Sequence, residues 1–318
     1  MRALVLNNEL KLNREYPTPN PRAGEALIQV TQAGICATDL EIVRGYMGFH
    51  GVLGHEFVGI VEQAIDRPDL VGCRVAGEIN AACRQCEICQ AGRPTHCPFR
   101  SVLGISGRDG AFADYLCLPY QNLHPLPHSL PDEQAVFIEP LAAACEITQQ
   151  ITVKPTDRVV VIGDGKLGLL CAQVLFLTGC SMTLLGRHPE KGHWLQERGI
   201  TFTTSVSDIP AGVDLVVEAT GQPDGFTLAH QLVRPRGTIV LKSTYHGNLN
   251  LNMSKLVVDE ISLIGSRCGP FSPAIRLLVQ GLVQVGPLAQ SQYSLDDGLQ
   301  AFEHAARKGA LKVILRIA

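Results

Sequence analysis

The feature that most constrains the fold is an alternation of buried strands and helices that begins at residue 158. Residues 158–162 read Arg-Val-Val-Val-Ile, an apolar run typical of a strand in a parallel sheet that is covered on both faces. A segment with helical periodicity follows, and the pattern then repeats. The expected strands are residues 158–162, 181–185, 201–203, 213–218, 237–241 and 261–265, with helices over 166–178 and 190–198. This alternation predicts a doubly wound parallel sheet.

The chain before this region has a different texture. Short apolar runs, such as residues 25–31 and 56–61, are separated by glycine and proline, which predicts a compact β-rich domain, a partly open barrel. At 318 residues the chain is long enough for two domains, each with its own core. The remaining expected elements are helices over residues 141–151, 274–280 and 299–306 and a closing strand over 311–317. We therefore expect an α/β protein whose β-rich domain is split, over residues 1–148 and 270–318, around a parallel-sheet domain over residues 149–269.

Composition argues against several classes of protein. The chain has 27 Lys and Arg against 30 Asp and Glu, so no dedicated nucleic-acid surface is expected. No run of about 18 apolar residues occurs, and we expect no membrane span. The N-terminal apolar run is too short for a signal peptide, which favours a cytoplasmic protein. In that reducing compartment the 11 cysteines are expected to be metal ligands or buried thiols.

A glycine-rich turn follows the strand over residues 158–162 directly and opens the next helix. The turn reads Gly163-Asp164-Gly165-Lys166-Leu167-Gly168 and fits the pattern G-x-G-x-x-G. Gly163 permits the tight turn, Gly165 lets a pyrophosphate approach the backbone, and Gly168 permits close packing of helix on strand. An ordinary glycine turn is the alternative. The strand–turn–helix context favours a dinucleotide site that includes Lys166 and Leu167.

The end of the second strand indicates which dinucleotide binds. An NAD site usually has Asp or Glu there to accept a hydrogen bond from the ribose 2′-hydroxyl. This chain has Gly186 instead, followed by Arg187, His188 and Lys191. Glycine leaves room for a 2′-phosphate, and the guanidinium of Arg187 can bind that phosphate through two hydrogen bonds, with His188 or Lys191 adding positive charge. We expect NADP(H) to be preferred over NAD(H), the alternative being that Arg187 is a solvated surface charge.

Two more positions are expected to touch the cofactor, because each follows a strand of the parallel sheet. Thr220 follows the strand over residues 213–218, and Arg267 follows the strand over residues 261–265. Dinucleotides bind outside the carboxyl ends of such strands.

Four cysteines within 15 residues form the most specific pattern in the chain. Their spacing is Cys83-x-x-Cys86-x-x-Cys89-x7-Cys97. Four thiolates at this spacing can surround one zinc ion tetrahedrally, which leaves no open position and gives the metal a structural role. An iron–sulfur cluster is the rival interpretation, because clustered cysteines also bind such clusters.

Three shorter motifs complete the pattern: Gly34-Ile35-Cys36-Ala37-Thr38-Asp39, Gly54-His55-Glu56 and Glu139-Pro140-Leu141-Ala142. Together with the glycine turn and the four cysteines, in this order, they resemble the zinc-dependent alcohol dehydrogenases of the medium-chain dehydrogenase/reductase superfamily. The last motif is similar to the signature of the polyol and threonine dehydrogenase branch. The resemblance covers essentially the whole chain and implies a GroES-like catalytic domain joined to a Rossmann domain.

The resemblance also implies roles for individual residues. Cys36, His55 and Glu139 match the ligands of a catalytic zinc, and Glu56 matches a glutamate that binds this zinc or stands behind it. Thr38 matches the hydroxyl that passes the substrate proton, and Asp39 matches the acid that orients the zinc-bound histidine. The classical enzymes have a further histidine shortly after Thr38, which this chain lacks, so the outer part of the proton relay stays open.

A zinc held by three protein ligands keeps a position for a substrate oxygen and acts on it as a Lewis acid. We therefore expect hydride transfer between NADP(H) and a small alcohol, aldehyde or ketone, in an enzyme with two zinc ions per chain. The resemblance further implies a homo-oligomer, either a dimer or a tetramer. A non-catalytic NADP(H)-binding sensor on the same fold is the alternative, and a zinc-independent quinone reductase is disfavoured by the four cysteines.

Overall fold

The computed structural model describes residues 1–244 and 253–318, which form two compact units. The first unit joins Met1–Glu139 to Phe271–Ala318, and the second is Pro140–Pro270. The first boundary thus falls near the beginning of the helix α4 (Ile138–Gln150), whereas the sequence suggested residue 148, near the end of that helix. Because the chain enters and leaves the second unit once, the first unit is assembled from two separate segments.

The first unit is organised around β3 (Glu25–Ile35), a strand whose apolar residues are almost all buried. β3 pairs antiparallel with three strands, and its sheet has the order β11-β6-β5-β3-β19-β18 with β10 also on β3. The other strands of this sheet are β5 (Glu56–Gln63), β6 (Arg74–Gly77), β10 (Tyr115–Pro119), β11 (Leu123–Pro125), β18 (Ala289–Ser294) and β19 (Lys312–Arg316). This central position of β3 brings residues from the beginning and the end of the chain onto one sheet.

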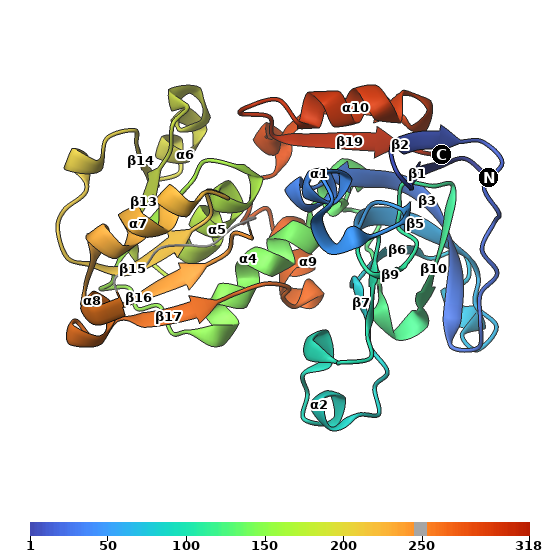
Figure 1. Ribbon diagram of the computed structural model, residues 1–318, viewed down its shortest axis with the longest axis horizontal. Helices are drawn as coiled ribbons and strands as arrows, with labels where there is room; N and C mark the ends of the chain where they lie inside the picture. Colours follow the sequence, from blue (N-terminus) through green and yellow to red (C-terminus); the bar gives the residue numbers. More distant parts are fainter. Residues whose placement is uncertain (245–252) are drawn as a thin grey trace. The chain divides into compact units, whose positions relative to one another are not determined.

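Two small sheets and five helices complete the first unit. The sheets are formed by β1 (Ala3–Leu6), β2 (Leu10–Asn13) and β4 (Gly51–Val52), and by β7 (Asn80–Ala81), β8 (Ser101–Leu103) and β9 (Gly107–Arg108). The helices are α1 (Ala37–Val43), α2 (Glu87–Gln90), α3 (Asp132–Ala135), α9 (Phe271–Val279) and α10 (Gly298–Ala305). The short helix α2 lies in the cysteine-rich loop between β7 and β8, which extends away from the sheets of this unit (Figure 1).

The second unit is a six-stranded sheet in which every described pair of neighbours is parallel. Its order is β14-β13-β12-β15-β16-β17. The strands are β12 (Arg158–Ile162), β13 (Ser181–Leu185), β14 (Thr201–Thr203), β15 (Val213–Glu218), β16 (Val233–Leu241) and β17 (Ser262–Gly265). The chain therefore adds strands first on one side of β12 and then on the other, and the predicted doubly wound α/β fold is confirmed.

Helix α4 precedes the first of these strands, and the other described helices of the second unit connect them (Figure 1). The connecting helices are α5 (Lys166–Phe176), α6 (His193–Glu197), α7 (Pro223–Leu232) and α8 (Met253–Val258). The helix expected over residues 190–198 is shorter, because a 3-10 turn over Pro189–Lys191 precedes α6 and Gly192 between them lies against the Phe202 ring. The sequence analysis did not predict α7. Among the described residues, no helix has the length and apolar character needed to cross a membrane.

Candidate active site

The glycine turn lies at the point where the order of the strands reverses. β12 is flanked by β13 and β15, which the chain adds in opposite directions, and the turn follows β12 directly. Gly163 has a φ of +113°, and a Cβ on it would lie 2.7 Å from the carbonyl oxygen of Ala219 after β15. A Cβ on Gly168 would collide with the carbonyl oxygen of Gly163. The backbone conformation and the packing of the protein are therefore enough to explain glycine at these two positions, without a cofactor.

Gly165 needs a different explanation. It has ordinary extended backbone angles at the beginning of α5, and a Cβ on it would meet no atom within 4 Å. The protein itself does not require glycine here, so the open space fits the close approach of a dinucleotide pyrophosphate to the first turn of α5. The residues of the turn thus fit a cofactor of this class.

The loop after β13 is held by a carboxylate from the glycine turn. Asp164 accepts hydrogen bonds from the backbone N–H groups of Arg187 and His188, at 2.7 and 2.8 Å, and lies 3.0 Å from Nδ1 of His188. The Lys191 ammonium is buried 3.9 Å from the same carboxylate. His188 and Lys191, of which one or the other was expected to add charge at the phosphate, are therefore turned toward Asp164, whereas the side chain of Arg187 is exposed.

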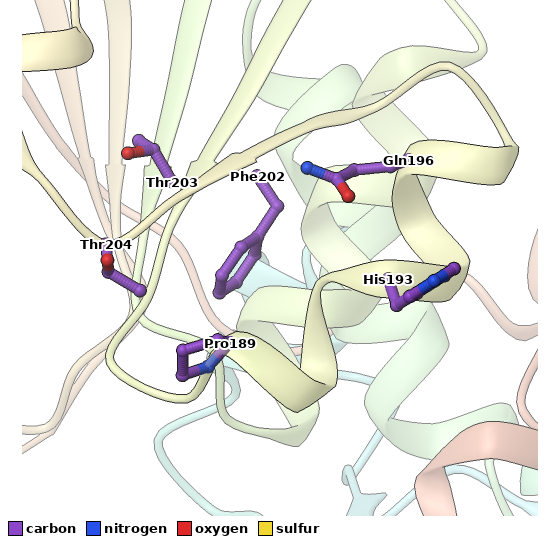
Figure 2. A pocket seen from close by; sticks show the side chains of 6 residues that line it. All are labelled: Pro189, His193, Gln196, Phe202, Thr203 and Thr204. Atoms are coloured by element: carbon purple, nitrogen blue, oxygen red, sulfur yellow. The ribbon is translucent and has the colours of Figure 1, made fainter.

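A shallow hollow lies beside this loop, between the end of β14 and helix α6. Figure 2 shows the ring of Phe202 among its lining residues, with Pro189 on one side and His193 and Gln196 of the helix on another. The same ring is close to the empty Cβ positions of Gly186 and Gly192. Phe202 therefore shapes the loop after β13 as well as the hollow.

A buried lysine links the ends of β16 and β17 to helix α4. Lys242, directly after β16, donates hydrogen bonds from Nζ to the carbonyl oxygen of Ala143 at 2.6 Å, to Oγ of Ser266 at 3.1 Å and to the carbonyl oxygen of Arg267 at 3.0 Å. Thr220 is held by Glu218, whose carboxylate accepts from its N–H and hydroxyl. The residues expected near the cofactor on this side, Thr220 and Arg267, thus lie on segments that are fixed by buried side chains.

In the first unit, Cys36, His55 and Glu56 form a compact group of possible metal ligands. One ligand atom from each lies within 4.8 Å of the others. Cys36 follows β3 and caps α1, while His55 and Glu56 stand at the beginning of the neighbouring strand β5. His55 and Glu56 are 3% and 0% exposed. A thiolate, an imidazole and a carboxylate are together a donor set that suits zinc.

Asp39 connects the parts of this group. Its carboxylate accepts a hydrogen bond from the backbone N–H of Cys36 at 2.8 Å and lies 3.1 Å from Nδ1 of His55. With Nδ1 occupied by this carboxylate, Nε2 of His55 is the nitrogen left for a metal. Burial lowers the pKa of His55, but the charges of Asp39 and Cys36 outweigh it and raise the pKa well above its ordinary value. The cluster therefore favours positive charge at its centre.

Glu56 presents one carboxylate oxygen to this centre. Its Oε2 forms a buried ion pair with Nζ of Lys312, whereas its Oε1 is buried and has no hydrogen-bond partner among the described residues. An unpaired buried carboxylate oxygen is costly. A zinc ion bound beside Cys36 and His55 would satisfy it, so the residues fit the metal.

The other two residues predicted for this centre, Thr38 and Glu139, lie outside the group of possible metal ligands. The hydroxyl of Thr38 lies 3.8 Å from Sγ of Cys36. Glu139, at the second position of α4, is half-buried and is not a member of the group that lies within 4.8 Å, although its charge acts on Lys312. In this structure Glu56, rather than Glu139, joins Cys36 and His55.

The four cysteines of the loop around α2 lie together as a second group. Their sulfur atoms are within 4.8 Å of one another. Backbone hydrogen bonds from Gln85 and Cys86 lower the pKa of Cys83 to about 6, which favours the thiolate that metals bind. All the cysteines are free thiols. Of the others, Cys145, Cys171 and Cys180 are buried as expected, whereas Cys73, Cys117 and Cys268 are only partly buried.

Comparison with known proteins agrees with this geometry. Residues 22–128 match the alcohol dehydrogenase GroES-like domain, and residues 167–280 match the zinc-binding dehydrogenase domain. Sorbitol dehydrogenase of Halalkalibacterium halodurans is 29% identical, over 95% of this chain and 94% of its own. L-Threonine 3-dehydrogenase of Streptomyces avermitilis is 30% identical, over 95% and 94%. The chain belongs to the zinc-dependent medium-chain dehydrogenase/reductase family.

Two solved structures share the fold over nearly their whole length. A zinc-binding dehydrogenase from Sinorhizobium meliloti, solved with NADP, has a TM-score of 0.89 at 28% identity and covers 99% of this chain and 98% of its own. RspB from Escherichia coli CFT073, solved with NADH, has a TM-score of 0.90 at 27% identity and covers 99% of both chains. The chain is thus an oxidoreductase of the alcohol dehydrogenase type, and the alternative of a non-catalytic sensor is not favoured.

Some residues that shape this dehydrogenase site were not singled out from the sequence. Lys312 begins an apolar strand and Lys242 directly follows one, so each resembles a solvated charge near the end of a strand. Asp164 occupies a variable position of the glycine pattern. Only the contacts of the folded chain reveal that these three charged groups are buried and hydrogen-bonded.

Proposed function

We propose that this dehydrogenase oxidises secondary alcohols, or reduces the matching ketones, with NADP(H) as its preferred cofactor. The observation that carries the proposal is the group of Cys36 with the buried His55 and Glu56, in which Oε1 of Glu56 has no hydrogen-bond partner among the described residues. Cys36, His55 and Glu56 would hold a catalytic zinc. When bound, this zinc supplies a Lewis acid for the oxygen of the alcohol or carbonyl group.

The protein residues have distinct tasks in this proposal. Asp39 holds the imidazole of His55 in one orientation through the 3.1 Å contact with Nδ1. The hydroxyl of Thr38, 3.8 Å from Sγ of Cys36, would hold the substrate hydroxyl and pass its proton on, accepting that proton as it releases its own to water. Glu139 supplies a second carboxylate near Lys312 and competes with Glu56 for the place of third ligand.

The cofactor would bind across the carboxyl ends of the parallel strands. The beginning of α5 would hold the pyrophosphate, with Gly163, Gly165, Lys166, Leu167 and Gly168 around it. Arg187 would bind the 2′-phosphate, since the strand end carries Gly186 in place of an acid and the guanidinium is exposed. Thr220 and Arg267 would line the nicotinamide side. The structural neighbours were solved with NADP in one case and NADH in the other, so Arg187 is the residue that supports NADP(H).

A second zinc would be held by Cys83, Cys86, Cys89 and Cys97 and would stabilise their loop rather than take part in catalysis. We also propose a homo-oligomer in the cytoplasm. The edge strand β17 carries an exposed Leu263, and the helix before it exposes Val257 and Val258, which favours contact with another copy. The free thiols fit a reducing compartment.

The metal content of cysteine variants tests the catalytic assignment. Wild type should contain two zinc ions per chain and oxidise members of a panel of secondary alcohols and polyols. Cys36→Ser should lose one zinc and nearly all activity, Cys86→Ser should lose the other zinc and stability, and Cys117→Ser, outside both groups, should lose neither. One zinc per chain, lost only in Cys86→Ser, would refute the catalytic centre.

Cofactor preference needs a separate test. The ratio of kcat/KM for NADPH to that for NADH should exceed one in wild type and should fall at least about tenfold in Arg187→Ala, because a charge-assisted bidentate contact is lost. Equal use of both cofactors by wild type would refute the preference without touching the zinc assignment.

A further inference from the structure

The carboxylate of Asp164 lies beside Gly186 at the end of β13, the position at which an NAD site usually carries an acid. It reaches from the glycine turn to the loop after β13 and is only 6% exposed. Oδ2 accepts from the N–H groups of Arg187 and His188, and both carboxylate oxygens lie 3.0 Å from Nδ1 of His188. Burial raises its pKa, but the hydrogen bonds of Arg187 and His188 and the charge of Lys191 outweigh burial and lower it. The carboxylate is therefore ionised at neutral pH.

This arrangement excludes an acid at the strand end itself. A Cβ on Gly186 would lie 2.6 Å from Oδ2 and 2.8 Å from Cβ of Asp164, and 2.7 Å from Cε2 of Phe202. A side chain at position 186 and the carboxylate of Asp164 therefore compete for one volume. Gly186 is needed because Asp164 fills the space, which gives this glycine a reason that does not depend on the cofactor.

The acceptor capacity of Asp164 is used within the protein. Four polar contacts surround the carboxylate, so it has little capacity left for a ribose 2′-hydroxyl. The same contacts hold His188 and Lys191 toward the glycine turn. Among the described residues, nothing forms a hydrogen bond or ion pair with the guanidinium of Arg187, which is exposed beside this fixed backbone.

We propose that Asp164 is a positioning residue for recognition of the 2′-phosphate: it clamps the loop over residues 187–191, so that Arg187 alone projects toward the adenosine ribose. The inference rests on the proposed preference for NADP(H). Asp164 acts through Arg187. Because its carboxylate fixes the backbone of residue 187 before the phosphate binds, less conformational entropy is lost when the guanidinium binds that phosphate.

Direct binding of cofactor fragments to the full-length protein tests this proposal without any turnover. Isothermal titration calorimetry should measure the Kd of 2′,5′-ADP and that of 5′-AMP, two fragments that differ by the 2′-phosphate. Wild type should bind 2′,5′-ADP at least about tenfold more tightly, as expected for a bidentate phosphate contact. Asp164→Asn should lower the ratio of the two affinities about fivefold or more by weakening the binding of 2′,5′-ADP, since the negative charge that holds the loop over residues 187–191 is lost.

Two further variants separate a positioning role from a general loss of structure. Asp157→Asn is the matched control: Asp157 also accepts a backbone N–H, that of Lys154 at 2.8 Å, but precedes β12 at the opposite end of the sheet. It should keep the wild-type ratio. His188→Ala removes the ring contact and leaves both backbone contacts, so it should lower the ratio less than Asp164→Asn and serves if the latter does not fold.

The double variant decides whether Asp164 acts through Arg187. Asp164→Asn should have no further effect on the ratio in an Arg187→Ala background. A wild type that binds both fragments equally would overturn the NADP(H) preference and this inference together. A wild type that prefers 2′,5′-ADP, loses the preference in Arg187→Ala and keeps it in Asp164→Asn would overturn only the inference. Tighter binding of 2′,5′-ADP by Asp164→Asn would overturn it as well, because Asp164 would then repel the phosphate.

Discussion

Lys312 and Glu56 form a buried ion pair across strand β3, over the backbone of Gly34. β3 lies between β5, which begins with Glu56, and β19, which begins with Lys312. Both side chains are 1% exposed. A Cβ on Gly34 would lie 2.5 Å from Oε2 of Glu56 and 3.1 Å from Cδ of Lys312. The pair holds one oxygen of Glu56 and leaves the other without a hydrogen-bond partner among the described residues, so the last strand of the first unit shapes the proposed zinc site.

Lys312→Met should destabilise the first unit strongly. The methionine fills most of the space but leaves the Glu56 carboxylate buried without its cation, a change that typically costs about 3–5 kcal/mol. Urea unfolding of the zinc-loaded protein measures the loss, and Lys308→Met, at an exposed position, should cost little. If Lys312→Met costs no more than Lys308→Met, the pair does not stabilise the fold.

Gly34→Ala should weaken the same pair from the backbone side. The added methyl group must push Glu56 and Lys312 apart, and overpacking of this kind costs about 1–3 kcal/mol. Zinc content should also fall, since Glu56 is displaced from Cys36 and His55. Gly286→Ala, where a Cβ would meet nothing within 4 Å, is the control in the same unit. Equal stability and zinc content in the two variants would contradict the role of Gly34.

Gly165→Ala should separate cofactor binding from folding. A Cβ at this position meets no atom of the protein within 4 Å, so the thermal midpoint should stay near that of wild type. The methyl group would instead lie where the pyrophosphate approaches α5, and the Kd for NADPH, measured by its fluorescence, should rise at least about tenfold. Gly168→Ala should lose the fold, because its Cβ collides with Gly163. An unchanged Kd in Gly165→Ala would place the pyrophosphate elsewhere.

The clamp formed by Asp164 should make the second unit sensitive to acid. Burial raises the pKa of Asp164, but the hydrogen bonds from Arg187 and His188 and the charge of Lys191 lower it more. The pKa is therefore lower in the folded chain than in the unfolded chain. The stabilisation is thus complete above the ordinary Asp pKa of about 3.9 and is lost as the pH falls through the lowered value. Unfolding followed by the fluorescence of Trp194, the single tryptophan, should show a difference between wild type and Asp164→Asn that is large at pH 7 and closes in acid. A difference that grows toward acid would contradict the clamp.

The sequence predicts the second unit well because the hydrophobic periodicity and the glycine-rich turns indicate the same strands and helices. The strands β12 and β13 have their predicted limits, and the G-x-G-x-x-G turn lies where the strand order reverses. The helix predicted over residues 190–198 is longer than the observed α6. The contact between Gly192 and Phe202 is a tertiary contact, which the local sequence pattern does not contain. Helix α7 was missed although Pro223 stands in its first turn, a common signal for a helix start.

The site is less predictable because its supporting residues come from distant parts of the chain. Cys36, His55 and Glu56 were found from short motifs, and the structure brings them together. The partner of Glu56 is 256 residues away, and no local pattern connects Lys312 to it. His188 and Lys191 were assigned to a phosphate from their charge alone, whereas the structure turns both toward Asp164.

Anomalous diffraction at the zinc edge, from crystals of the protein as purified, tests the central claim most directly. The account predicts two peaks per chain. One should lie among Cys83, Cys86, Cys89 and Cys97, and the other about 2.0–2.3 Å from Sγ of Cys36, Nε2 of His55 and a carboxylate oxygen, with one coordination position left for substrate or water. A single peak within the four cysteines, or a second zinc with four protein ligands and no such position, would contradict it.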